Sequence, residues 1–187
     1  IKKNIKRVGA VTQDLLTYSK QREPEFEVCM PNDIAADVIQ LVEDFAGANG
    51  VLISKEFDTH IGEIVADPQT IHRSLLNLMN NAIDACMDDE DVSKKHEVKI
   101  KTYKDENNYF CFEVKDNGCG MDEDIQKQLF NPMFSSKGGK GTGLGLLVTG
   151  KLIEEHKGVI ETETSQGIGS TFRIKLPLEK ANAVDKV

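Results

Sequence analysis

A glycine-rich stretch over residues 138–145 reads Gly-Gly-Lys-Gly-Thr-Gly-Leu-Gly and leads into a predicted helix. Free backbone N–H groups and the positive end of a helix dipole therefore meet at one place, which suits a phosphate. Residues 131–151 contain three lysines and no acidic residue, although the whole chain carries a net charge of −8. The pattern favours phosphate binding, and a glycine loop with solvated lysines is the alternative.

Two familiar phosphate loops do not fit this stretch. Gly145, Gly150 and Lys151 approach the P-loop spacing, but Leu152 stands where a serine or threonine must hold magnesium. A dinucleotide fingerprint requires GxGxxG after a strand, whereas the spacing here is GxGxG after a polar loop. We therefore reject both motifs.

A pair of asparagines forms a second candidate site. Asn77 and Asn81 lie one turn apart in a predicted helix, so their amides project from the same face. Asparagine has a poor helix propensity, and a neutral amide oxygen suits Mg²⁺ that is otherwise held by phosphates and water. Helix capping or backbone bonding by these amides is the structural alternative.

A carboxylate beside two glycines forms a third candidate. Asp116 follows a predicted strand, and Gly118 and Gly120 would let a ligand approach the backbone closely. A buried carboxylate there can accept a hydrogen bond from the exocyclic amine of adenine, and guanine would leave it unpaired. An Asp-Asn-Gly sequence is also common in plain turns.

The acidic balance disfavours nucleic acid and anionic lipid as partners. We expect no direct membrane contact, because no apolar run approaches the roughly 20 residues of a bilayer span. The four cysteines match no zinc-binding spacing, which predicts reduced thiols and a cytoplasmic location.

Hydrophobic periodicity predicts helices and hairpins in a mixed order. Helices are expected over residues 1–20, 33–45, 68–87, 122–130 and 143–156. Strands are expected over 51–57, 97–104, 109–115, 159–164 and 171–176, with an edge strand near Phe26 and Val28. This order predicts an α+β two-layer sandwich, a mixed, mostly antiparallel sheet covered by helices on one face.

These motifs, in this order, resemble the catalytic and ATP-binding domain of sensor histidine kinases, within the wider family shared with DNA gyrase, Hsp90 and MutL. The resemblance covers about residues 30–178. Residues 77–82 are similar to the N box, 116–120 to the first glycine box and 130–134 to the F box. Residues 141–145 and 167–172 are similar to the later glycine boxes.

The resemblance implies a Bergerat-type fold with ATP and Mg²⁺ as cofactors. Asn81 would hold Mg²⁺, Asp116 would bind adenine directly and through water near Thr171, and residues 141–145 would close over the phosphates. The residues implied in nucleotide binding are Asn77, Asn81, Asp116, Gly118, Gly120, Met121, Phe130, Lys137, Gly141, Thr142, Gly143, Leu144, Gly145 and Thr171.

The resemblance also divides the chain. Residues 1–22 are similar to the second helix of the dimerisation and phosphoacceptor hairpin, 23–180 form the ATP-binding domain, and 181–187 form a tail. None of the four histidines has the acceptor context, and we expect structural roles for His72 and His156. The implied partners are an acceptor hairpin of the parent kinase, a response regulator and a second copy in a homodimer, and the parent's relation to a membrane stays open.

One position separates the functions that remain. In the hydrolase branch of the family, a glutamate four residues before the magnesium ligand activates water, but Asn77 occupies that place and cannot accept a proton. We therefore expect ATP-dependent transfer of the γ-phosphate to a histidine that this sequence lacks. The alternatives are an ATPase, a serine-directed anti-sigma-type kinase, or a nucleotide-binding regulator without transfer activity.

Overall fold

The computed structural model describes residues 23–131 and 143–178. The helices are α2 (Pro31–Ala48), α3 (Pro68–Met87), α4 (Glu123–Gln126) and α5 (Gly145–Glu155). The strands are β1 (Glu27–Cys29), β2 (Leu52–Phe57), β3 (Ile64–Ala66), β4 (Glu97–Lys104), β5 (Tyr109–Asp116), β6 (Val159–Ser165) and β7 (Gly169–Pro177). The predicted helix over 1–20 and the predicted tail lie outside the described residues.

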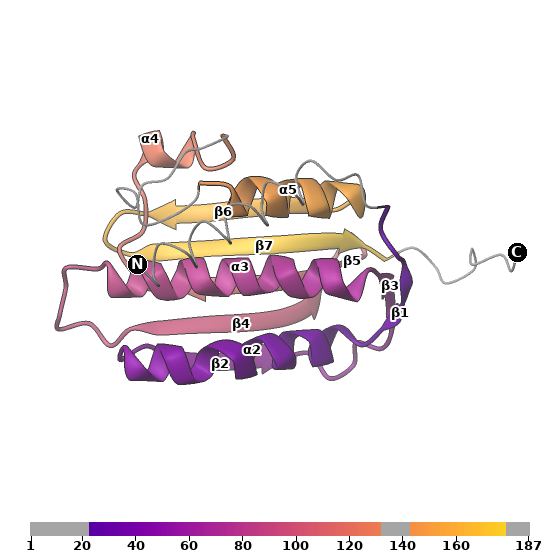
Figure 1. Ribbon diagram of the computed structural model, residues 1–187, viewed down its shortest axis with the longest axis horizontal. Helices are drawn as coiled ribbons and strands as arrows, with labels where there is room; N and C mark the ends of the chain where they lie inside the picture. The colour runs from indigo at the N-terminus through magenta and orange to yellow at the C-terminus, as the bar shows by residue number, and fades with distance from the viewer. Residues whose placement is uncertain (1–22, 132–142, 179–187) are drawn as a thin grey trace, which may run out of the picture.

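Five strands form one mixed sheet in the order β2-β4-β5-β7-β6. Only β2 and β4 pair in parallel, and the other three pairs are antiparallel. The strands β1 and β3 form a separate antiparallel ladder. Helices α2, α3 and α5 lie side by side over one face of the main sheet, which confirms the predicted two-layer α+β sandwich (Figure 1).

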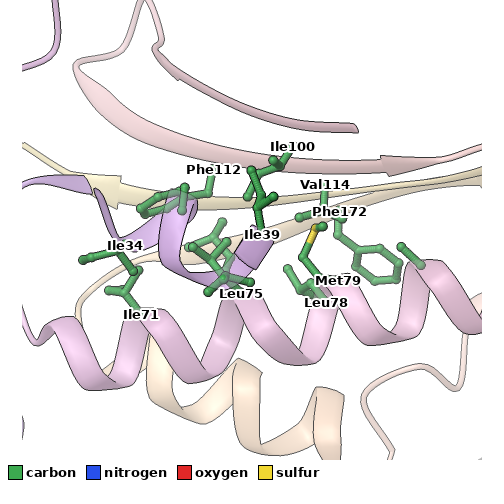
Figure 2. Close-up of a cluster of buried hydrophobic side chains, with 14 of the residues drawn as sticks. Ile34, Ile39, Ile71, Leu75, Leu78, Met79, Ile100, Phe112, Val114 and Phe172 are labelled. Carbon is green, nitrogen blue, oxygen red and sulfur yellow. The ribbon is translucent and has the colours of Figure 1, made fainter. Parts of the chain in front are cut away.

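Helix α3 is the central element of the helical layer. Its bounds agree with the prediction because Asp67 caps its first turn, where Oδ1 accepts hydrogen bonds from the N–H groups of Gln69 and Thr70. Its buried face meets side chains from the strands in a continuous core (Figure 2). The core side chains labelled there on α3 are Ile71, Leu75, Leu78 and Met79.

The opposite face of the sheet carries ion pairs between neighbouring strands. Lys101 Nζ lies 2.8 Å from Glu56 Oε1, and Arg173 binds both Glu113 and Glu163. In β4 and in the second half of β7, partly exposed side chains such as Lys101 and Arg173 alternate with buried ones, as expected for a sheet with one covered face. The face away from the helices is therefore polar.

Some predicted elements differ in extent. The strand β3 was not predicted, because three apolar residues between Glu63 and Asp67 show no alternation. The short helix expected over 122–130 is confined to Glu123–Gln126. Among the described residues, no helix is long and apolar enough to span a membrane, and all four cysteines are free thiols.

Candidate functional site

Asp116 is the last residue of β5, and its side chain is almost completely buried. Its Oδ1 atom accepts hydrogen bonds from the backbone N–H groups of Gly118, at 2.9 Å, and Ser170, at 3.2 Å. Burial raises the pKa of this carboxyl from its usual 3.8 to about 6, while these two N–H groups and the charge of Lys94 act to lower it. A buried carboxylate whose Oδ1 is held by backbone donors can use its other oxygen for a ligand.

The glycines around Asp116 allow main chains to approach one another. A Cβ at Gly118 would lie 2.4 Å from the carbonyl carbon of Ala85 in α3. Gly120 has a φ of +61°, and a Cβ there would lie 2.0 Å from the carbonyl oxygen of Ser165. The turn after β5 is therefore packed against both the end of α3 and the turn between β6 and β7.

Two further predicted residues border this turn. The backbone N–H of Met121 donates to Thr164 Oγ1 at 3.0 Å, which ties the end of the turn to β6. Thr171 is buried in β7 and pairs in register with Lys115, the residue before Asp116. The structure thus brings Thr171 to the segment of Asp116, Gly118, Gly120 and Met121, although Thr171 lies far from these four residues in the sequence.

The two predicted asparagines of α3 have different surroundings. Asn77 Nδ2 donates to Thr149 Oγ1 of α5 at 2.9 Å, and that hydroxyl donates to the carbonyl oxygen of Gly145 at 2.9 Å. The Asn81 side chain is partly exposed and makes no hydrogen bond to any other described residue. Asn77 is therefore a contact between helices, and Asn81 is accessible to a ligand.

The start of α5 lies close to Asn77. A Cβ at Gly145 would lie 2.5 Å from Asn77 Oδ1, so a larger residue at this position would displace the Asn77 amide. Gly143 has a φ of +68°, and Leu144 is buried as the residue that precedes the helix. These contacts place the end of the predicted lid segment, residues 143–145, against helix α3.

Phe130 lies against helix α5, since a Cβ at Gly150 of this helix would lie 3.6 Å from Phe130 Cδ1. The predicted residues Lys137, Gly141 and Thr142 lie outside the described residues. Three polar residues of this region were not predicted as site residues: Lys94, Thr149 and Ser170. Ser170 belongs to the segment compared with the last glycine box, but no pattern in the sequence marks the other two.

The donor set fits Mg²⁺ bound together with a nucleotide. In the described part of the chain, no group of three His, Cys, Asp or Glu side chains could hold a metal ion alone. Mg²⁺ commonly takes one or two protein ligands beside substrate phosphates and waters. The accessible Asn81 amide provides a suitable oxygen for that arrangement.

His156 lies away from these residues, at the other end of α5. Its Nε2 accepts the backbone N–H of Asp67 at 3.1 Å, and its Nδ1–H donates to the carbonyl oxygen of Leu152 at 2.8 Å. Both ring nitrogens are thus engaged within the fold, and the ring is buried. This geometry agrees with the structural role expected for His156.

Comparison with known proteins assigns the family. Residues 66–180 match the model of the histidine kinase-, DNA gyrase B- and HSP90-like ATPases, and the chain belongs to this family. It is 31% identical over 176 residues to the signal transduction histidine-protein kinase AtoS of Escherichia coli, covering 94% of this chain and 28% of AtoS. It is 32% identical to sporulation kinase C of Bacillus subtilis, covering 94% of this chain and 39% of that kinase.

Solved structures agree with this assignment. The catalytic domain of histidine kinase ThkA superposes with a TM-score of 0.71 and 29% identity, covering 82% of this chain and 96% of that domain. ThkA in complex with the response regulator TrrA matches with a TM-score of 0.76 and 26% identity, covering 94% of this chain and 48% of ThkA. The fold is that of a histidine kinase catalytic domain, and the chain spans well under half of the two curated relatives named above.

Proposed function

We propose that this chain is the ATP-binding catalytic domain of a two-component sensor histidine kinase. It binds ATP with Mg²⁺ and transfers the γ-phosphate to a histidine on an acceptor helix hairpin. The membership of the ATPase family and the likeness to the ThkA catalytic domain support this function.

The observation that carries the proposal is the buried Asp116 carboxylate. Two backbone N–H groups hold its Oδ1 atom, so the carboxylate is oriented before a ligand arrives. Its other oxygen is then suited to accept the N6 amine of adenine. Guanine presents an acceptor at the same place, so the site would select adenine by leaving guanine unpaired.

Asn81 is the residue proposed to hold the metal. Bound Mg²⁺ neutralises charge on the β- and γ-phosphates during phosphoryl transfer. The Asn81 amide oxygen would supply one protein ligand from α3. Gly143, Leu144 and Gly145, with Lys137, Gly141 and Thr142 earlier in the same segment, would contact the phosphates.

The surroundings of Asn77 favour transfer over hydrolysis. Its amide occupies the place of a general base in the hydrolase branch, and its nitrogen donates to Thr149. An amide cannot take a proton from water, so water attack on the γ-phosphate lacks a base at this position. A neutral imidazole is already a nucleophile and needs no such base.

The partners follow from the same proposal. The phosphoryl group would pass from the acceptor histidine to an aspartate of a response regulator, as the complex of ThkA with a response regulator suggests. The full-length protein would act as a homodimer. Its catalytic domain would work in the cytoplasm, where four free cysteines stay reduced.

A transfer experiment tests the proposal. γ-Labelled ATP and Mg²⁺ are added to this chain with a separately supplied acceptor hairpin from the parent kinase, and phosphate release is followed in parallel. The matched control is the same hairpin with its acceptor histidine replaced by alanine. We expect acid-labile, base-stable label on the intact hairpin only, with little free phosphate.

Rapid phosphate release without labelled hairpin would contradict the proposal and identify an ATPase. Acid-stable label on a serine would instead support the serine-directed alternative. Nucleotide binding without either product would indicate a regulator.

A further inference from the structure

Lys94 lies in the loop between α3 and β4 and makes three contacts with different parts of the chain. Its Nζ donates to Asp89 Oδ2 at 2.7 Å, to the carbonyl oxygen of Gly167 at 3.1 Å and to that of Gly118 at 3.4 Å. An ammonium group has three donors, so each N–H has an acceptor. The two carbonyls lie 24 and 73 residues from Lys94 in the sequence.

The ion pair of Lys94 with Asp89 differs from an ordinary surface pair. The side chains are only 21% and 8% exposed, respectively. The other oxygen of Asp89 accepts the backbone N–H of Asp91 at 3.1 Å, which fixes the carboxylate within its own loop. Asp89 therefore holds the Lys94 ammonium in place between the two carbonyls.

Gly118 and Gly167 belong to the two turns that hold Asp116. The first turn supplies the Gly118 N–H to Asp116 Oδ1, and the residues after the second turn supply the Ser170 N–H. The end of β5, the α3–β4 loop and the β6–β7 turn all lie at one end of the sheet (Figure 1). We infer that Lys94 is a positioning residue for nucleotide binding, because its ammonium ties the turn that contains the Gly118 N–H to the turn that precedes the Ser170 N–H, and these two N–H groups orient Asp116.

The charge of Lys94 acts in the same direction as its hydrogen bonds. It lowers the pKa of Asp116 against the effect of burial, so it favours the ionised carboxylate that adenine requires. The other titratable groups near Asp116 are the thiols of Cys86 in α3 and Cys119 in the turn, and burial raises the pKa of both. The charges of Asp89 and Asp88 also act on Cys119 in this turn, and Asp89 is paired with Lys94.

This inference rests on the proposed nucleotide site, and ADP is the probe that tests it. Affinity for ADP is measured by calorimetry for the wild-type chain, Lys94→Met and Lys95→Met. Lys95 is exposed, and Lys95→Met removes the same charge one residue away, so this variant is the matched control. We expect Lys94→Met to weaken ADP binding about tenfold, whereas Lys95→Met binds like the wild type.

A double variant separates positioning from the cost of an orphaned charge. Lys94→Met leaves Asp89 ionised and without its partner, which destabilises the loop. In Lys94→Met with Asp89→Asn, that buried charge is absent, yet the link to the two carbonyls is still missing. We expect this variant to regain stability toward urea while its ADP affinity remains about tenfold below the wild type.

The pH dependence of ADP affinity is a second measurement. A loss of packing alone would not shift it. The fall in ADP affinity on the acid side should shift to higher pH in Lys94→Met, because the ammonium no longer favours the Asp116 carboxylate. Lys95→Met should keep the wild-type profile. Wild-type affinity and an unchanged profile in Lys94→Met would overturn the inference.

Hydrogen exchange on the ligand-free chain distinguishes this inference from the proposed function. The N–H of Gly167 donates to the carbonyl oxygen of Cys119 at 2.7 Å and should exchange faster in Lys94→Met if the two turns separate. Unchanged exchange would overturn the role of Lys94. If the wild-type chain binds no ADP but Lys94→Met still exchanges faster, Lys94 connects the two turns as inferred. Only the proposed nucleotide site would then be contradicted.

Discussion

The adenine half and the phosphate half of the proposed site differ in what holds their functional side chains. Around Asp116, the backbone N–H groups of Gly118 in the turn and of Ser170 in β7 bind the carboxylate, and close main-chain contacts at Gly118 and Gly120 fix the turn. In the described part of the phosphate half, the Asn77 side chain makes a single hydrogen bond, to Thr149, and the Asn81 side chain makes none. The adenine half is thus built into the sheet, and the phosphate half depends on side chains between helices.

This difference predicts how substitutions act. A change at Asp116 should alter both folding stability and binding, since the carboxylate is part of the main-chain network. A change at Asn81 should alter the proposed chemistry with little effect on the fold. The four predictions below test this separation, from the largest expected effect to the smallest.

Asn81→Ala should reduce phosphotransfer to the acceptor hairpin by about a thousandfold, because the metal loses its protein ligand. The free energy of unfolding should change by less than about 1 kcal/mol, since the side chain is partly exposed. Transfer is measured with γ-labelled ATP, and stability by urea unfolding. The neighbouring Asn80→Ala, which is exposed, is the control and should keep wild-type transfer. Full activity of Asn81→Ala would remove Asn81 from the metal site.

Asp116→Asn should make the ligand-free domain more stable above pH 6. In the folded chain the Asp116 carboxyl has a pKa of about 6, compared with the usual 3.8. The folded state therefore loses stability as the pH rises between these values. The ionised carboxylate then costs about 3 kcal/mol at pH 7. The amide keeps an oxygen for the two backbone donors and carries no charge.

The measurement is urea unfolding of both proteins between pH 3.5 and pH 8. The stabilising effect of Asp116→Asn should disappear near pH 4, where the carboxyl is neutral in both folded and unfolded chains. Glu106→Gln, at an exposed turn, should show no such effect. A variant that is less stable than the wild type at pH 7.5 would mean that the network favours the ionised form.

The same variant should bind ADP about 10- to 100-fold more weakly at pH 7.5, because the adenine amine loses a charged acceptor. Wild-type affinity should decrease as the pH falls through about 6, the pKa of Asp116. The ratio of wild-type to variant affinity isolates this effect, because the phosphates of ADP titrate in both measurements. Unchanged preference for ADP over GDP in Asp116→Asn would remove Asp116 from the adenine pocket.

Local signals in the sequence predicted most of the fold. The Asp67 cap followed by Pro68 marks the start of α3, and alternating residues mark both hairpins. The strand β3 has three residues and forms because β1 lies beside it, so its pairing depends on tertiary contact. Short segments of this kind carry no period that could be recognised.

The site shows the same division between local and distant contacts. Asp116, Asn77 and Asn81 stand in recognisable patterns, so roles for them could be proposed from the sequence. Lys94 and Thr149 bind partners up to 73 and 72 residues away, and any residue type can supply the carbonyl oxygens that Lys94 contacts. Only the folded chain brings these groups together.

Thr149→Val is the variant with the smallest expected effect, and it tests the phosphate half of the proposed site alone. Valine has nearly the shape of threonine but cannot accept the hydrogen bond from Asn77 or donate to Gly145. Loss of that link is worth about 1 kcal/mol, so Mg-ATP affinity should decrease about fivefold. Thr149→Ser keeps the hydroxyl and should restore the affinity.

Adenosine, which has no phosphate, shows whether the two halves respond separately. Its affinity should be the same for the wild type, Thr149→Val and Thr149→Ser, because the Asp116 network contains no contact from α5. An equal loss of adenosine and Mg-ATP binding in Thr149→Val would mean that α3 transmits the change from Asn77 to the turn packed against Ala85. The two halves would then act as one unit, and their different construction would have no functional consequence.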